Sequence, residues 1–390
     1  MKEINTEVLI IGSGLVGLVA AHALSVLNYD VTVVEKKNVF NQKNSSKDTR
    51  TVAVSEGSKR FLDNLDLWRL LDSYAEPVKT IKVYDRFPNN KIIFENKRKN
   101  EKLGYVIENN KFINILFNNL KKFKNTKVLF GQNITKINIK KNFSTIPLEN
   151  CSIKSKLIIA ADGKNSNIKK IVGNKTFNKF YPENALVVNL THENNLNNTA
   201  YEIFYKTGPL AILPMKSMSG INKSTIIWSN KPTFIKKLTS SNKIFFLNIM
   251  EEKIGNIVGK IIKINSTQEF PLSAHINDSF INKRLIYVGD SAHSIHPIAG
   301  QGWNLGVNDV KNLYEISKDK KFNVGSEIFC KKYNSLSYNK AFQLYQITDK
   351  LNSHFKNNFF LNRFVGYGGF KIIDNNQFLK NKISEYAMGF

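Results

Sequence analysis

The N-terminal stretch constrains the fold more than any other part of the chain. Val8–Ile11 is a short apolar run typical of a buried parallel strand. A glycine turn follows it, and a helical pattern then continues through Leu27. A second apolar run, Val31–Val34, ends at the acidic Glu35. Strand, glycine turn, helix, strand and acid in this order predict a Rossmann unit that binds a dinucleotide.

Each glycine of the Gly12-x-Gly14-x-x-Gly17 turn has a mechanical role in this pattern. Gly12 makes the tight turn, Gly14 lets the backbone approach a pyrophosphate, and Gly17 lets helix and strand pack closely. The helix N-terminus faces the phosphates, and Glu35 takes the ribose hydroxyls. The alternative is a tight strand–helix turn without a ligand. Because Glu35 disfavours a 2′-phosphate, NAD and FAD both stay open on this motif alone.

A second glycine turn follows the apolar run Leu285–Val288. The run ends in Gly289-Asp290, and after a loop Gly300-Gln301-Gly302 leads into a helical stretch from about Asn304. Such a turn brings bare backbone N–H groups and one carboxylate to a bound polar cofactor. FAD is long enough to reach from the N-terminal unit to this distant turn, whereas a nicotinamide dehydrogenase needs no second turn. The two turns together indicate FAD.

The chain resembles the class A flavoprotein monooxygenases, and among them the ubiquinone-biosynthesis hydroxylases that act on polyprenylphenols. The class is indicated by both glycine turns, by Ala160-Ala161-Asp162-Gly163 and by the loop His296-Pro297-Ile298-Ala299-Gly300-Gln301-Gly302. The subfamily is indicated by that loop and by the stretches Asp48–Ser55, Gly208–Met215 and Ala387-Met388-Gly389. The resemblance runs from Val8 to the C-terminus.

The resemblance implies an α/β fold in three parts. A Rossmann-like FAD-binding domain of the para-hydroxybenzoate-hydroxylase type is expected over 1–75, 100–180 and 268–330. A substrate domain with a mixed or antiparallel sheet is inserted at 76–99 and 181–267, and C-terminal helices occupy 331–390. The apolar patterns themselves predict strands at 78–84, 91–94, 127–130, 134–139, 157–161, 185–190, 200–205, 210–213 and 224–228. They predict helices at 110–120, at 244–257 and beyond 309, and a loop at 38–47.

The resemblance also implies the chemistry. A reduced nicotinamide, NADH or NADPH, passes a hydride to FAD, and the reduced flavin takes up O₂. The resulting C4a-hydroperoxide delivers a hydroxyl group to an electron-rich ring, here that of a polyprenylated phenol in ubiquinone biosynthesis. Two alternatives stay open: a flavin hydroxylase of a small soluble aromatic compound, and a non-catalytic FAD-bound scaffold subunit.

Several site residues follow from the family pattern. Arg50 is expected beside the flavin and the active-site entrance, and Asp162-Gly163 near both FAD and the nicotinamide. Asp290 accepts hydrogen bonds from the ribityl chain, and the helix from about Asn304 directs its positive end at the flavin. The expected cofactor contacts are Gly12, Gly14, Gly17, Glu35, Arg50, Asp162, Gly163, Gly289, Asp290, Pro297, Gly300, Gly302 and Asn304.

The expected catalytic residues are Arg50, His296 and Pro297, although most of the chemistry resides in the flavin. Pro297 shapes the loop against the flavin ring. His296 as an acid or base near the substrate competes with loop packing and hydrogen bonding, the alternative for both His293 and His296. A metal site made with Asp290 is disfavoured, because proline and glycines interrupt this segment and no other ligand cluster accompanies it.

Two residues depart from the family pattern. Asn28 stands where a glycine usually ends the first helix, and asparagine is the next-best residue for a left-handed cap. Lys169 stands where an arginine usually follows the Asp-Gly turn. Lysine cannot make the bidentate fork of arginine, which changes how a phosphate is held there.

Charge and composition bear on location and partners. The formal charge is +26, from 57 basic and 31 acidic residues spread along the chain. This reflects either compositional drift or attraction to an anionic membrane surface. No nucleic-acid-binding motif accompanies it, so nucleic acid is not an expected partner. Two cysteines indicate reduced thiols, and no stretch of about 18 apolar residues is present. We expect a cytoplasmic enzyme, peripheral on the cytoplasmic membrane face, that associates with other ubiquinone-biosynthesis proteins.

Overall fold

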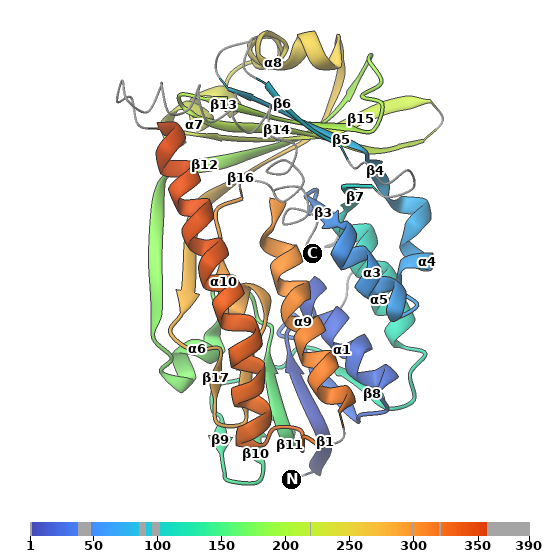
Figure 1. Ribbon diagram of the computed structural model, residues 1–390, viewed down its shortest axis with the longest axis vertical. Coiled ribbons are helices and arrows are strands. Elements are labelled where there is room, and N and C mark those ends of the chain that lie inside the picture. The colour runs from blue at the N-terminus through green and yellow to red at the C-terminus, as the bar shows by residue number, and fades with distance from the viewer. Residues whose placement is uncertain are drawn as a thin grey trace.

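The structure is a computed structural model that describes residues 2–37, 48–85, 91–95, 102–218, 220–297, 300–319 and 321–356. The chain builds two eight-stranded sheets, a three-stranded sheet and the helices that cover them (Figure 1). The loop predicted at 38–47, Ile298-Ala299 of the second glycine turn and Ala387-Met388-Gly389 lie outside the described residues.

The first sheet contains the N-terminal Rossmann unit. Its order is β17-β18-β11-β1-β2-β8, and the five strands from β18 to β8 run parallel. The strands are β1 (Lys2–Ile11), β2 (Val31–Val34), β8 (Thr126–Leu129), β11 (Cys151–Ala160), β17 (Ile281–Asn282) and β18 (Leu285–Tyr287), with β9 (Asn138–Ile139) and β10 (Ser144–Pro147) at the edge of β11. The inner strands are continuous apolar runs because both of their faces are buried.

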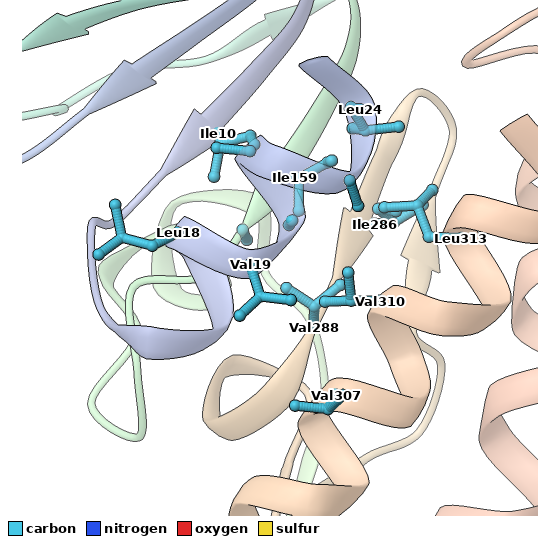
Figure 2. Close-up of a cluster of buried hydrophobic side chains, with 14 of the residues drawn as sticks. Ile10, Leu18, Val19, Leu24, Ile159, Ile286, Val288, Val307, Val310 and Leu313 are labelled. Atoms are coloured by element: carbon cyan, nitrogen blue, oxygen red, sulfur yellow. The ribbon is translucent and has the colours of Figure 1, made fainter. Parts of the chain in front are cut away.

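Four helices flank this sheet: α1 (Leu15–Val26), α5 (Asn109–Leu120), α9 (Gly302–Lys318) and α10 (Glu327–Lys356). Figure 2 shows where α1 and α9 meet the sheet, with Val19 of α1 facing Val288 and Val310. The labelled side chains of this cluster are at most 1% exposed. The C-terminal part of the chain therefore packs directly on the N-terminal unit.

The second eight-stranded sheet has the order β19-β16-β12-β15-β14-β13-β5-β6 and is antiparallel except where β13 meets β5. Its strands are β5 (Thr80–Asp85), β6 (Lys91–Glu95), β12 (Thr176–His192), β13 (Thr199–Tyr205), β14 (Gly208–Met218), β15 (Ile221–Asn230), β16 (Ile261–Asn277) and β19 (His293–Ser294). The helices α7 (Pro232–Thr239) and α8 (Lys243–Val258) cover one face, and the opposite face is turned toward the Rossmann part (Figure 1).

The third sheet, β3-β7-β4, lies between the other two, as Figure 1 shows. Its strands are β3 (Thr51–Ser55), β4 (Glu76–Val78) and β7 (Gly104–Glu108). The remaining short elements are α3 (Glu56–Asn64), α4 (Trp68–Leu71), η1 (Asp72–Tyr74), α6 (Asn167–Val172) and η2 (Gly289–Ser291). This architecture is the predicted α/β fold with a second, mostly antiparallel sheet. The division into domains by residue range stays a proposal.

Some predicted elements need correction. The strand predicted at 134–139 is wrong except for Asn138–Ile139, because the residues before β9 pair with no strand. The helices α6 and α7 were not predicted, although both carry end signals. Ser166 accepts a hydrogen bond from the backbone N–H of Lys169 at the start of α6, and α7 begins with Pro232. Both helices are too short to show a clear apolar period.

No helix in the described ranges has the length and apolar content needed to cross a membrane.

The cap after α1 gives a first prediction. Asn28 has a φ of 63°, the left-handed conformation predicted for it, and its side chain is exposed. Asn28→Ala should destabilise the fold by about 1 kcal/mol, because alanine is strained in this conformation. Asn28→Gly is the matched control and should be neutral or slightly stabilising. Denaturant unfolding checks this, and equal stabilities of the two variants would contradict it.

Candidate active site

The first glycine turn is shaped by close backbone contacts. Gly12 has a φ of 107°, and a Cβ atom there would lie 2.4 Å from the carbonyl oxygen of Ala161. A Cβ atom on Gly17 would lie 2.1 Å from the carbonyl oxygen of Gly12. Both glycines are therefore needed for strand β1, helix α1 and the end of β11 to approach one another.

Gly14 differs from its two neighbours in this turn. Its φ of −69° suits any residue, and a Cβ atom there would meet nothing within 4 Å. The fold itself therefore does not require glycine at this position. Gly14 precedes the first turn of α1, where free N–H groups attract anions. An open glycine at a helix N-terminus fits the close approach of a pyrophosphate.

Glu35 lies beside the same turn. One of its carboxylate oxygens accepts hydrogen bonds from the Ser13 backbone N–H at 2.9 Å and hydroxyl at 2.7 Å, and the other accepts from the Lys37 N–H at 3.0 Å. Burial alone would raise the pKa of Glu35, but these donors hold it below its usual value. Glu35 is therefore an anionic acceptor held at the edge of the turn, as the binding of ribose hydroxyls requires.

The second glycine turn packs directly on helix α1. A Cβ atom on Gly289 would lie 3.0 Å from Cγ2 of Val16, and one on Gly306 would lie 2.9 Å from the same atom. Val16 is one of the variable positions within the first glycine motif. The two turns, far apart in the sequence, are thus brought together by one valine side chain seated between two glycines.

A buried hydrogen-bonded pair, Asp309 and His293, fixes the second turn. Asp309 of α9 is fully buried, and one of its oxygens accepts from the Gly289 N–H at 2.9 Å. The same oxygen lies 2.6 Å from Nε2 of His293, whose side chain is 1% exposed. These hydrogen bonds hold the backbone on both sides of Asp290. His293 is therefore occupied within the protein.

The side chain of Asp290 is exposed to solvent. Burial raises its pKa, and the positive groups of His293, Lys164, Arg50 and Lys169 counteract this. Because the side chain keeps solvent contact, a ligand can reach it. A carboxylate in a positively charged environment can accept hydrogen bonds from ligand hydroxyl groups.

The segment that follows the Asp-Gly turn after β11 contributes two lysines, Lys164 and Lys169, to this positive environment. Asp162 accepts from the Ile168 N–H at 3.1 Å, and Lys164 donates to the Ser273 carbonyl oxygen at 2.8 Å. Lys169 lies 3.1 Å from Nε2 of His275. Burial and the nearby positive charges lower the pKa of His275 to about 3, so its neutral ring can accept a hydrogen bond from the lysine ammonium group. Lys169 is thus tied to a protein partner.

Arg50 joins the Rossmann part to the second large sheet. It forms an ion pair with Asp48 at 2.7 Å, and its guanidinium group lies 5.1 Å from the ring centre of Phe270. The preceding Thr49 is bound by two residues of the sheet: Asn189 donates to its carbonyl oxygen at 2.6 Å, and Gln268 accepts from its N–H at 3.4 Å. The Arg50 side chain is 51% exposed, so it remains accessible to a ligand.

The loop that leads to α9 places the other predicted residues. His296 is fully buried, and its ring packs edge-on against Tyr181 at 4.7 Å, which is the packing alternative. Its catalytic role stays a prediction.

Pro297 is exposed, and Gly302 begins α9 with an open Cβ position. Asn304 accepts from the Ser55 N–H at 2.9 Å and donates to the carbonyl oxygens of Ala53 and Gly300. Its side chain is therefore used to hold the loop.

The second large sheet presents a mostly apolar face toward these turns. Strand alternation and register place Val187, Ile227, Ala211, Glu202 and Val83 in one row across neighbouring strands, on the face opposite α7 and α8. Ala200, two residues before Glu202, packs on that face against Val78 and Val106. We name this row the substrate wall.

Glu202 is the titratable residue of the substrate wall, and the sequence analysis did not single it out. Its side chain is half-buried and forms no hydrogen bond or ion pair within the described ranges. Burial raises its pKa to about 8. The signal in the sequence was an acid in a strand whose same-face neighbours, Ala200 and Phe204, are apolar.

Comparison with known proteins finds a matching family, relatives of similar sequence and solved structures of similar fold. Residues 5–316 match the model of the family described as FAD binding domain. The chain is 26% identical to ubiquinone hydroxylase UbiL of Rhodospirillum rubrum, covering 98% of this chain and 89% of the relative. It is 24% identical to 3-demethoxyubiquinol 3-hydroxylase of Escherichia coli over the full length of both. The p-nitrophenol 4-monooxygenase of Pseudomonas putida has the same fold, with a TM-score of 0.80, 16% identity and coverage of 100% and 99%.

The three glycines of the first turn give a second prediction. Gly17→Ala should unfold or strongly destabilise the protein, because its Cβ atom would overlap the Gly12 carbonyl group. Gly14→Ala should leave the melting temperature without cofactor unchanged and weaken FAD affinity by about tenfold or more, since it blocks only the ligand side. Thermal melting and FAD fluorescence titration separate the two effects. Unchanged FAD affinity in Gly14→Ala would show that the turn does not hold the cofactor.

Proposed function

The chain belongs to the FAD binding domain family and is an FAD-dependent aromatic monooxygenase, and we propose that it hydroxylates a polyprenylated phenol in ubiquinone biosynthesis. The observation that carries the proposal is the contact between the two glycine turns, together with the mostly apolar sheet face turned toward them. Similarity to ubiquinone hydroxylases over almost the whole chain supports the substrate class.

We propose that FAD lies across the two glycine turns. Glu35 would accept hydrogen bonds from the ribose, Gly14 and the start of α1 would face the pyrophosphate, and Asp290 would bind the ribityl chain. Bound FAD would take a hydride from NADH or NADPH and, with O₂, supply the hydroxyl group. The start of α9 at Gly302 would direct its positive end at this group.

The protein then has to hold the phenol and keep water away from it. The apolar side chains of the substrate wall, such as Val187 and Ile227, would contact the ring and its prenyl chain. Glu202 would face the phenol hydroxyl group. A carboxyl group that titrates near pH 8 can accept a proton or a hydrogen bond from a phenol, which makes the ring richer in electrons.

The substrate wall also bears on the alternative of a small aromatic acid as substrate. Such a substrate needs a positive side chain to hold its carboxylate. The titratable residue of the substrate wall is instead an acid, and a substrate carboxylate beside Glu202 would raise its pKa further and keep it from accepting the phenol proton. Glu202 therefore favours a neutral phenol over an aromatic acid.

A polyprenylated phenol partitions into membranes. We propose that the enzyme meets this substrate at the cytoplasmic membrane face, in association with other proteins of ubiquinone biosynthesis. The net charge of +26 suits an anionic surface.

The first experiment identifies the cofactor and the substrate class. Purified protein should release FAD, and a short-chain polyprenylphenol should stimulate its oxidation of NADH or NADPH. Labelled oxygen from O₂ should appear in the hydroxylated product by mass spectrometry. Stimulation by an aromatic acid alone would contradict the proposed substrate. Tight FAD binding without oxidation of any phenol would instead support a scaffold subunit.

Substitution of Glu202 gives a further prediction. Glu202→Gln should lower kcat for hydroxylation by about a hundredfold, because the amide cannot accept the phenol proton. The wild-type rate should rise with pH through about 8, as the carboxylate forms, and the variant should lose this rise. Rate profiles over this pH range check both statements. An unchanged kcat would exclude contact between Glu202 and the phenol.

Stability provides the control for this variant. The folded-state pKa of Glu202 is about 8 against a reference of 4.5, so the folded chain binds the extra proton between these values. Wild-type stability from this group therefore falls as pH rises from about 4.5 to about 8. Glu202→Gln removes this loss and should melt higher than wild type at pH 8, with a smaller difference at pH 5. Loss of activity together with loss of stability would indicate a structural role instead.

A further inference from the structure

The outer layer of the second sheet carries three exposed large apolar side chains on its two helices. Phe234 of α7 is 37% exposed, and Ile244 and Phe245 at the start of α8 are 71% and 48% exposed. The buried side of the same two helices already covers the sheet through residues such as Ile235 and Phe246. The three exposed side chains are therefore additional to the core. They are not part of the buried core that these helices form with the sheet.

The residues around these three side chains are basic. Residues 231–250 contain four lysines and no acidic residue. The four lysines are exposed and form no ion pair within the described ranges. We define the α7–α8 surface as the three apolar side chains together with these lysines, namely Lys231, Phe234, Lys236, Lys237, Lys243, Ile244 and Phe245. Its charge is complementary to an anionic lipid headgroup layer.

We propose that the α7–α8 surface docks the enzyme on an anionic lipid membrane. Large apolar side chains at the ends of two short helices can enter the boundary between headgroups and acyl chains. Lysines beside them bind lipid phosphates, and their long side chains can extend along the surface. A protein partner of comparable stability would need a larger complementary area than three apolar side chains provide.

A hollow beside this surface reaches strand β16, whose Gln268 contacts the segment that carries Arg50. The hollow has a volume of about 590 Å³ and lies between the start of α8 and strand β16. It is lined by Lys243 and Phe246 at one side and by Gln268 at the other. Gln268 binds the backbone of Thr49, the neighbour of Arg50. Docking at this surface would bring lipid close to the candidate active site. This step of the inference rests on the proposed function, in which the substrate is lipid-like.

The test uses full-length protein with bound FAD and two kinds of vesicle, phosphatidylcholine alone and phosphatidylcholine mixed with phosphatidylglycerol. Flotation should recover wild type with the anionic vesicles only, and added salt should weaken binding. Ile244→Ser combined with Lys237→Glu should weaken vesicle binding by at least tenfold. A matched control, Ile328→Ser with Lys332→Glu, changes the same residue types at the start of α10, far from α7 and α8 (Figure 1). It should bind as wild type does.

Two outcomes would overturn the proposal. Wild type that fails to float with anionic vesicles has no such membrane affinity. A control variant that loses as much binding as the test variant shows that total charge, and not the α7–α8 surface, is responsible. The readout does not depend on catalysis, so vesicle binding without hydroxylation of any phenol would refute the proposed function and leave the docking surface standing. Hydroxylation of a phenol without vesicle binding would refute the docking surface and leave the proposed function standing.

Discussion

The candidate site depends on the contact between Val16 and the glycines of the second turn. Gly289 and Gly306 leave just enough room for the Val16 side chain, which itself belongs to the first glycine motif. A side chain at Gly306 would push α9 away from α1, and one at Gly289 would push the second turn away, so that the two glycine turns would separate. The Rossmann unit, the second turn and helix α9 therefore form one rigid support, and the apolar cluster of Figure 2 lies directly behind it.

Polar contacts then fix what this packing brings together. Asp309 holds Gly289 through its N–H, and Asn304 holds the loop before α9 against β3. Both residues come from α9, and both bind backbone groups that would otherwise be buried without partners. The side chains of this helix therefore set the shape of the site, and its N-terminus is left facing the space where a cofactor is proposed. Asn304 was expected to bind the cofactor, and in the structure its side chain holds the loop before α9 against β3.

The sequence predicted those features whose cause is local. The glycine turn, the strands beside it and the left-handed Asn28 follow from a few neighbouring residues, and the structure has them. Glu202 could not be identified in this way. Its importance depends on the register of five strands and on which sheet face α7 and α8 cover. Neither is encoded near Glu202. The link between Thr49 and the sheet through Asn189 and Gln268 was hidden for the same reason.

Three carboxyl groups in this protein lie in three different electrostatic environments. Hydrogen-bond donors hold the pKa of Glu35 low, so it stays an acceptor beside the first turn. Burial raises the pKa of Asp290, and four positive groups act against this rise. Glu202 forms no hydrogen bond or ion pair with the residues that the structure describes, and burial raises its pKa to about 8. A charged carboxylate suits the many hydroxyl groups of a dinucleotide, whereas a neutral one disturbs an apolar wall least. The distribution of charge thus matches a polar cofactor on one side and an apolar phenol on the other.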